Sequence, residues 1–129
     1  GQTWEAALMA GKLKLDNLTA IIDRNNIQID GMTEDIMPLE PLRAKYEAFN
    51  WHVIEINGHS FEEINNAVET AWAIYEKPVA IIAHTIPGKG IDFMEFSYPW
   101  HSKTFKPKEV TESLRQLRTL GGKIKSEHE

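Results

Sequence analysis

Three short segments of the chain carry side chains and backbones suited to holding an anion or a metal ion. They are residues 23–26 (Asp-Arg-Asn-Asn), 57–59 (Asn-Gly-His) and 85–90 (Thr-Ile-Pro-Gly-Lys-Gly). Asn offers a neutral oxygen ligand, and Gly lets the backbone approach a bound group closely. The alternative is that Asn and Gly simply form turns, and composition alone favours that alternative.

Each polar segment follows a short apolar run that predicts a buried strand. Apolar residues at helical spacing predict four helices around these strands, and Ser60 with Glu63 forms a capping box at the start of one of them. The strands are expected at 18–23, 52–56 and 79–85, and the helices at 3–15, 41–50, 60–75 and 107–120.

Two of the expected helices have apolar stripes that should face the core. The first combines Trp4, Leu8 and Leu15 with the small residues Ala7 and Gly11. The second stripe runs along the helix at 60–75 and comprises Phe61, Ile64, Val68, Ala71 and Tyr75. His84 lies at the end of a strand, where a core histidine is the better interpretation.

Alternation of strands with helices predicts an α/β fold with a parallel sheet and right-handed crossovers. Ligands of such sheets bind at the carboxyl ends of the strands, where all three polar segments lie. No strand precedes the first helix, and three strands make a thin sheet. We therefore expect an incomplete sheet whose free edge is covered by another chain or segment.

Composition narrows the possible classes of function. The 129 residues are 42% hydrophobic and 26% charged, as in an ordinary soluble domain. A net charge of −5 argues against a nucleic-acid partner, and the absence of cysteine excludes disulfides, thiolate zinc sites and a catalytic thiol. Without a membrane-length apolar run or a signal peptide, we expect a cytoplasmic protein with no membrane partner.

Four segments, taken in order, resemble the N-terminal, diphosphate-binding domain of transketolases. They are 15–18 (Leu-Asp-Asn-Leu), 23–31 (Asp-Arg-Asn-Asn-Ile-Gln-Ile-Asp-Gly), 51–59 (Trp-His-Val-Ile-Glu-Ile-Asn-Gly-His) and 88–90 (Gly-Lys-Gly). One such segment alone is a weak signal, but four in the same order and spacing are specific. The resemblance extends from Gly1 to about Lys103 and implies a parallel-sheet thiamine diphosphate-binding fold.

The family's motif opens with Gly-Asp-Gly, which by its spacing from Asn25 would lie ahead of Gly1. We therefore expect residues 1–97 to be the C-terminal portion of this domain, or part of a subunit of a split transketolase. Residues 98–129 are expected to form an active-site loop, a C-terminal helix and a tail.

The resemblance also implies a Mg²⁺ ion that neutralises the diphosphate of the cofactor. Asn25 would contribute its side-chain oxygen and Ile27 its main-chain carbonyl. The Asp of Gly-Asp-Gly, the phosphates and water would complete an octahedral shell. The alternative for Asn25 is a turn former without a ligand.

Three more residues are implied at the cofactor. Ile29 resembles a residue that packs on the thiazolium ring, with a core isoleucine as the alternative, and Gly88 would allow close backbone approach. His101 lies in Trp-His-Ser-Lys, which is similar to the family's Trp-His-Gly-Lys. That histidine would donate to phosphate or carry protons near the substrate, and the alternative is a loop histidine without a role.

The implied reaction transfers a two-carbon ketol unit from a ketose phosphate to an aldose phosphate. This chain would bind the diphosphate side and would not be catalytic alone. Its expected partners are a chain or segment carrying Gly-Asp-Gly, a pyrimidine-binding transketolase subunit or domain, and sugar phosphates. Two alternatives remain: an enzyme like 1-deoxyxylulose-5-phosphate synthase, and a non-catalytic subunit that keeps the fold. Residues 27–31 and 51–55 favour transketolase.

Overall fold

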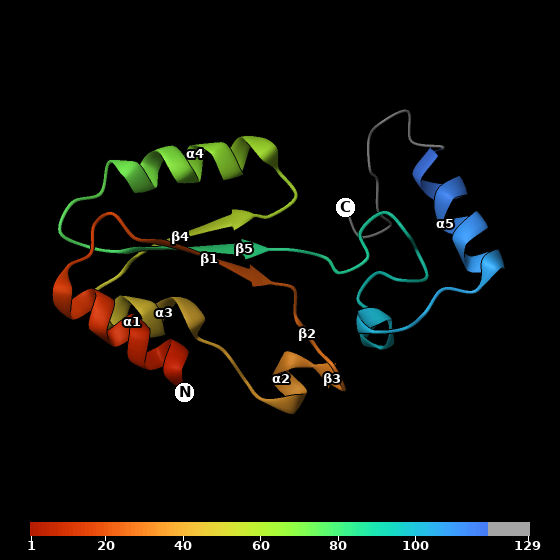
Figure 1. Cartoon of the computed structure of the whole chain (residues 1–129), viewed down its shortest axis with the longest axis horizontal. Coiled ribbons are helices and arrows are strands. Elements are labelled where there is room, and N and C mark those ends of the chain that lie inside the picture. The colour runs from red at the N-terminus through yellow and green to blue at the C-terminus, as the bar shows by residue number, and fades with distance from the viewer. Residues whose placement is uncertain (119–129) are drawn as a thin grey trace. The chain divides into compact units, whose positions relative to one another are not determined.

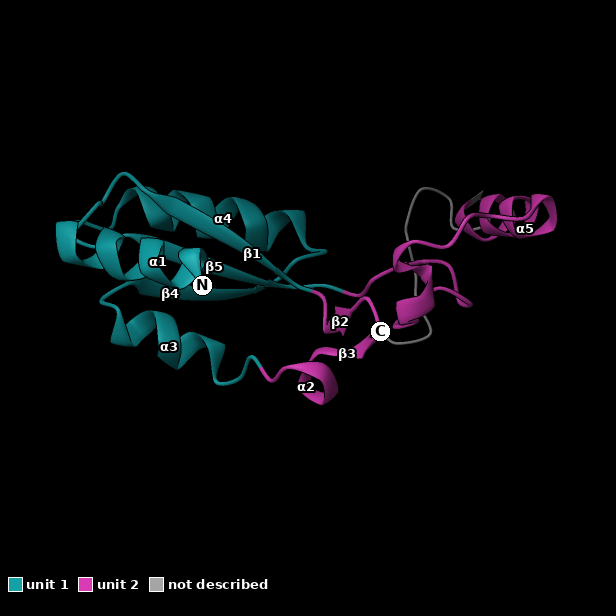
Figure 2. Ribbon diagram, turned by 60° about the horizontal axis from the view of Figure 1, so that its bottom comes forward, with its two compact units in different colours: residues 1–24, 39–85 teal, residues 25–38, 86–129 magenta. Residues whose placement is uncertain are grey.

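The computed structural model describes residues 1–118 and divides the chain into two compact units (Figure 2). Unit 1 consists of Gly1–Arg24 and Leu39–Thr85, and unit 2 of Asn25–Pro38 and Ile86–Glu129. The division expected after residue 97 is based on motifs and stays a prediction. The compact units are divided by contacts and have other boundaries.

Unit 1 is a three-stranded parallel sheet with helices on both faces (Figure 1). The strand order is β1-β5-β4, so the last strand in sequence lies in the middle. This arrangement confirms the predicted α/β class. The elements are α1 (Gln2–Leu13), β1 (Thr19–Arg24), α3 (Leu42–Ala48), β4 (His52–Asn57), α4 (Phe61–Trp72) and β5 (Val79–His84).

The core of unit 1 is organised by β5, whose side chains are buried on both faces. Val79 and Ile81 pack beneath α4, and Ala80 and Ile82 pack on the opposite side with α1 and α3. Burial on both faces explains why this strand reads as a continuous apolar run rather than an alternating one. Within the described residues, β1 and β4 pair on one side only.

Helix α1 packs through Trp4 and the expected small residues, but not through Leu8. Ala7, Ala10 and Gly11 are buried, whereas Leu8 is 57% exposed. A Cβ on Gly11 would lie 1.8 Å from the carbonyl oxygen of Phe49, so the backbones of α1 and the end of α3 are in close contact. The indole N–H of Trp51 reinforces this contact by donating to the carbonyl of Ala7 over 2.8 Å.

Helix α4 differs from its predicted face at both ends. Phe61 and Tyr75 are 85% and 80% exposed, and the helix ends at Trp72. Ser60 does cap the helix by accepting the Glu63 amide over 3.2 Å. The carboxylate of Glu63, however, accepts from the amide of Asn57 and so closes the turn after β4 instead of a reciprocal capping box.

Unit 2 contains short elements that the sequence suggested only as a loop and one helix. Strands β2 (Ile27–Gln28) and β3 (Gly31–Met32) form an antiparallel pair, followed by a turn of helix, α2 (Thr33–Ile36). A 3₁₀ helix, η1 (Tyr98–His101), contacts both strands. Helix α5 (Pro107–Arg118) matches its prediction, except that residues 119 and 120 lie outside the described residues.

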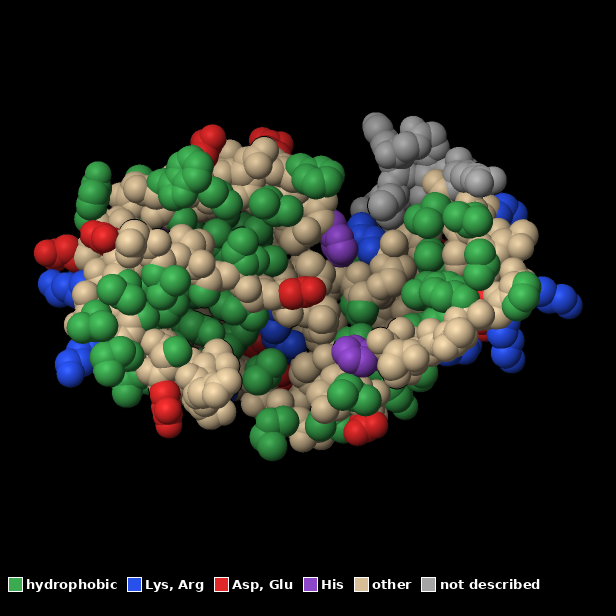
Figure 3. Space-filling model, in the orientation of Figure 1, with side chains coloured by type: hydrophobic (Ala, Val, Ile, Leu, Met, Phe, Trp, Pro, Cys, Tyr) green, Lys and Arg blue, Asp and Glu red, His purple; other side chains and the backbone are tan. Residues whose placement is uncertain are grey.

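Apolar side chains remain on the surface over α1 and α4, as the space-filling view shows (Figure 3). Ile21 of β1 faces the same side of the sheet as α4. Because α4 packs against β4 and β5, Ile21 is left 64% exposed. None of the helices in residues 1–118 is both long and apolar enough to cross a bilayer.

Candidate functional site

The carboxyl ends of the three parallel strands lie side by side, as the sequence predicted. In the sheet register, Arg24 of β1 and Asn57 of β4 are both paired with His84 of β5. Hydrogen bonds continue past the ladder, because the Gly58 amide donates to the His84 carbonyl over 2.8 Å. Hydrogen bonds between neighbouring strands therefore continue to the edge where ligands of α/β sheets bind.

The turn that directly follows β1 is tight and irregular, as predicted. The side-chain oxygen of Asn25 accepts the Ile27 amide over 3.1 Å, and Asn26 adopts a left-handed conformation with φ of 64°. The carbonyl of Asn26 then accepts the Thr33 amide over 3.0 Å. The turn is thus held by its own side chain and by the segment that follows the hairpin.

The donor set at this turn fits a hard divalent cation that arrives with anionic ligands. One lone pair of the Asn25 side-chain oxygen accepts the Ile27 amide, which leaves a second lone pair for another partner. Neutral amide and carbonyl oxygens suit Mg²⁺, but they bring no charge. A diphosphate would supply that charge. In residues 1–118, no group of three or more His, Cys, Asp or Glu is placed to hold a metal ion.

Ile29 lies between β2 and β3, at the tip of the hairpin. Its side chain is 58% exposed, so the alternative interpretation of a core isoleucine is wrong. Packing against a cofactor ring stays a prediction for this apolar side chain.

Gly88 has a positive φ of 75°, and a Cβ there would lie 2.5 Å from the Cβ of Met94. Gly88 therefore lies close to Met94 in the same loop, and close approach of its backbone to a cofactor stays a prediction. The loop is also held by Glu95, which sequence reasoning missed. This buried carboxylate accepts the Gly90 amide over 2.8 Å.

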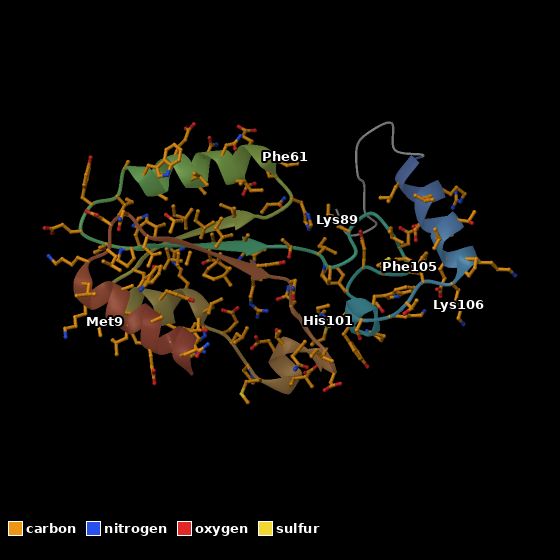
Figure 4. The ribbon with its side chains drawn as sticks, in the orientation of Figure 1. Met9, Phe61, Lys89, His101, Phe105 and Lys106 are labelled. Carbon is orange, nitrogen blue, oxygen red and sulfur yellow. The ribbon has the colours of Figure 1, made fainter. Side chains whose placement is uncertain are left out.

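His101 ends η1 and has an exposed side chain (Figure 4). The preceding Trp100 lies between Phe93 and Phe105, with ring centroids 5.3 and 5.2 Å away. The Lys103 ammonium sits 3.9 Å from the centroid of the Trp100 ring. These contacts hold the aromatic side chains of this stretch together, and the imidazole is not among them.

All of the residues that the sequence assigned to the cofactor belong to unit 2. Since η1 contacts β2 and β3, the structure brings the element that carries His101 against the hairpin that carries Ile27. The predicted site residues are thus grouped in one compact unit, although they are far apart in the sequence. They are Asn25, Ile27, Ile29, Gly88 and His101.

His84 is not a core residue. It is exposed, and its Nε2 lies 2.8 Å from the carboxylate of Glu55, which also pairs with Arg43 over 3.3 Å. The hydrogen bond from His84 lowers the pKa of the Glu55 carboxyl, and the bond from Arg43 acts in the same direction.

An ion pair between a buried arginine and a half-exposed glutamate, next to the turn, also escaped sequence reasoning. Arg24 is only 4% exposed, and its Nε lies 3.0 Å from the carboxylate of Glu40. The second carboxylate oxygen of Glu40 accepts the Leu42 amide over 2.8 Å at the start of α3. Strand alternation was the available signal, since Ala20, Ile22 and Arg24 must share the face that packs on α1 and α3.

The Glu40 carboxylate should make stability depend on pH. Its bond from the Leu42 amide, and then the contact with Arg24, hold its pKa below the ordinary carboxyl value. A lowered pKa in the folded state stabilises the fold above about pH 4.3, and this contribution is lost as the pH falls further. We expect the wild type to unfold at higher urea than Glu40→Gln near pH 6.5, with a gap that narrows toward about pH 3.5. A gap that stays constant would contradict this assignment.

Comparison with known proteins places these features in a family. Residues 1–123 match the model described as transketolase, thiamine diphosphate binding domain. A 6-deoxy-6-sulfo-D-fructose transketolase subunit of Clostridium sp. is 50% identical over 94% of this chain and 44% of its own length. One of the apulose-4-phosphate transketolase subunits, from Phocaeicola vulgatus, is 38% identical over 99% of this chain and 46% of its own length.

The fold is shared with a crystal structure of Campylobacter jejuni transketolase. The TM-score is 0.82 at 37% identity, and the match covers 90% of this chain and 18% of that one. The chain spans less than half the length of the two subunit relatives. Because the family model covers nearly all of the sequence, this chain belongs to the thiamine diphosphate-binding domain family of transketolases.

Proposed function

We propose that this chain binds the diphosphate end of thiamine diphosphate through Mg²⁺, as one part of a transketolase. The observation that carries the proposal is the turn at Asn25–Ile27. It directly follows β1 at the ligand-binding edge of a parallel sheet, and its side-chain oxygen keeps a second lone pair. The turn also lies within the residues that match the family model.

In this proposal each predicted residue has a distinct role. Asn25 and the carbonyl of Ile27 are ligands of Mg²⁺, and the exposed side chain of Ile29 packs on the thiazolium ring. Gly88 keeps the loop at 86–91 compact, so that its backbone can lie near the diphosphate. His101, which is exposed, donates an imidazole N–H to phosphate or substrate oxygens.

When bound, thiamine diphosphate would supply the nucleophilic carbon that this chemistry needs. The protein's contribution from this chain is binding and orientation of the diphosphate, together with proton transfer at His101. The reaction we propose moves a two-carbon ketol unit between ketose and aldose phosphates. Relatives named as transketolases support this choice over an enzyme like 1-deoxyxylulose-5-phosphate synthase.

The proposed enzyme needs parts that this chain does not supply. Two of the relatives are named as subunits, and this chain spans less than half of their length. We propose that a segment or chain with Gly-Asp-Gly provides the charged Mg²⁺ ligand, and that a second subunit or domain binds the pyrimidine. The expected cytoplasmic location stays a prediction.

Binding of thiamine diphosphate by the full-length protein with its partner subunit tests the proposal. We expect calorimetric titration to give an affinity at least about tenfold higher with Mg²⁺ than with a chelator, because the ion would supply the positive charge that the neutral protein oxygens lack. Thiamine without the diphosphate is the matched control and should show no dependence on Mg²⁺. Equal affinity of the diphosphate with and without Mg²⁺ would reject the proposal.

A further inference from the structure

The segment that carries the proposed metal ligands leaves unit 1 and returns to it through two neighbouring points. Residues 25–38 belong to unit 2, whereas Arg24 before them and Leu39 after them belong to unit 1. We call the two chain ends at residues 24 and 39–40 the neck of this segment. Both ends lie within unit 1.

The neck is closed by the ion pair between Arg24 and Glu40. The guanidinium is almost completely buried, and the carboxylate, 51% exposed, uses both of its oxygens. One oxygen accepts from Arg24, and the other accepts the Leu42 amide that begins α3. One carboxylate thus joins the end of β1 to the start of α3.

Each side of the neck is also attached to a regular element. On the incoming side, the Arg24 carbonyl accepts the Thr85 amide over 3.3 Å, beyond the end of β5. On the outgoing side, the Lys45 ammonium of α3 donates to the carbonyl of Leu39 over 2.6 Å. These two bonds hold each end separately, whereas the Arg24–Glu40 contact spans both ends.

We propose that Arg24 and Glu40 are positioning residues, whose ion pair closes the neck of segment 25–38 and so limits the movement of the metal-binding turn at Asn25–Ile27. The proposal rests on the proposed function, because it assigns a task to residues next to that site. Asn25 follows Arg24 directly in the chain, so a shift at the neck is passed to the turn through one peptide unit.

The pair suits this task because Mg²⁺ tolerates little movement of its ligands and because the guanidinium is buried. Mg²⁺ requires nearly ideal octahedral geometry at short distances, so small displacements of a ligand oxygen weaken binding. A buried guanidinium has lost its water, and it needs a carboxylate to offset that cost, which favours one fixed arrangement over several. The lowered pKa of Glu40 shows that its carboxylate is stabilised in its charged form.

Glu40→Gln is the informative variant, because Glu40 is half-exposed and the amide keeps its size while losing the charge. Arg43→Gln is the matched control. Arg43 lies on α3, and its substitution removes ion pairs to Glu47 and Glu55 but none at the neck.

Hydrogen–deuterium exchange of the cofactor-free, full-length protein measures how far the neck restrains segment 25–38 when no metal is bound. In Glu40→Gln we expect amides within 26–37 to exchange about tenfold faster, as expected for loss of a charge-assisted hydrogen bond, and amides of α4 to stay unchanged. Arg43→Gln should leave residues 26–37 unaltered. Unchanged exchange of 26–37 in Glu40→Gln would overturn the proposal.

The Mg²⁺ dependence of thiamine diphosphate binding measures how loss of the ion pair changes the affinity of the turn for the metal. In Glu40→Gln the half-saturating Mg²⁺ concentration should rise about tenfold, whereas saturating Mg²⁺ should restore wild-type binding. General destabilisation would instead lower binding at every Mg²⁺ concentration. Arg24→Lys keeps the charge and should recover part of the affinity that Arg24→Gln loses.

The outcomes separate this inference from the proposed function. If Asn25→Ala abolishes Mg²⁺-dependent binding while Glu40→Gln leaves the Mg²⁺ requirement unchanged, the positioning role is rejected and the site stands. If the wild type binds thiamine diphosphate without Mg²⁺, the proposed function fails, and the role of the pair in metal positioning fails with it.

Discussion

Asn25→Ala is expected to abolish the Mg²⁺-dependent retention of thiamine diphosphate by the full-length enzyme. The substitution removes the only side-chain oxygen that we assign to the metal in this chain, and it also removes the bond that the Ile27 amide donates to Asn25. Loss of a ligand at a site whose other protein oxygen here is a neutral carbonyl should weaken binding by about a hundredfold or more. Gel filtration followed by assay of bound cofactor measures the effect.

Two further substitutions at Asn25 separate the ligand from the turn former. Asn25→Ser keeps a short hydroxyl that can accept a nearby backbone amide, but that hydroxyl does not extend as far as the amide oxygen of Asn. Asn25→Asp keeps both the acceptor and its reach. We expect Asn25→Ser to fail like Asn25→Ala and Asn25→Asp to retain the cofactor. Wild-type retention by Asn25→Ser would show that Asn25 only shapes the turn.

Asn57→Ala provides a control elsewhere in the sheet. The side chain of Asn57 accepts the His59 amide over 3.0 Å, in the same way that Asn25 accepts the Ile27 amide. Both substitutions therefore remove an equivalent turn bond. A loss of Mg²⁺-dependent retention confined to Asn25→Ala would assign the effect to the ligand rather than to the turn.

The sequence was sufficient to locate elements whose side chains are all buried or whose residues favour one backbone conformation. Strand β5 is buried on both faces and reads as an unbroken apolar run, so its position was predicted to within one residue. The helix expected at 41–50 ends at Asn50, whose left-handed conformation, with φ of 66°, is one that Asn tolerates. Parallel pairing then followed from the alternation of strands and helices.

The sequence was insufficient for very short elements and for the ends of helix faces. Strands β2 and β3 have two residues each, too few for a repeat of two to be recognised. Phe61 and Tyr75 fall at helical spacing from buried positions, but they are largely exposed in the described part of the chain. Hydrophobic periodicity locates a helix, yet it does not determine how far the neighbouring layer extends.

The candidate site divides in the same way. The tight turn at Asn25 was predicted from local chemistry, because Asn favours such turns and directly follows a strand. The Arg24–Glu40 pair joins residues that are distant in sequence, and strand alternation indicates only that Arg24 is buried. The partner, Glu40, is positioned by the start of α3. The pair can therefore be identified only when the positions of both the strand and the helix are known.

Gly11→Ala is expected to destabilise the fold by at least about 3 kcal/mol, although alanine is the better helix former by about 1 kcal/mol. Within α1, the new Cβ would lie 1.8 Å from the carbonyl oxygen of Phe49 and 3.0 Å from its carbonyl carbon. Both atoms belong to the backbone, so no side-chain rotation can relieve the overlap. The helix must move away from α3, and the bond from Trp51 to the Ala7 carbonyl would be strained or lost.

Leu8→Ala in the same helix is the matched comparison. The apolar stripe predicted from the sequence and the observed structure give different expected costs for this substitution. The apolar stripe read from the sequence makes Leu8 a core residue, whose truncation should cost about 2–5 kcal/mol. In the structure Leu8 is 57% exposed, so we expect less than about 1 kcal/mol. Urea unfolding of both variants measures the difference. A stabilised Gly11→Ala together with a strongly destabilised Leu8→Ala would show that α1 packs through its leucines and not through its small residues.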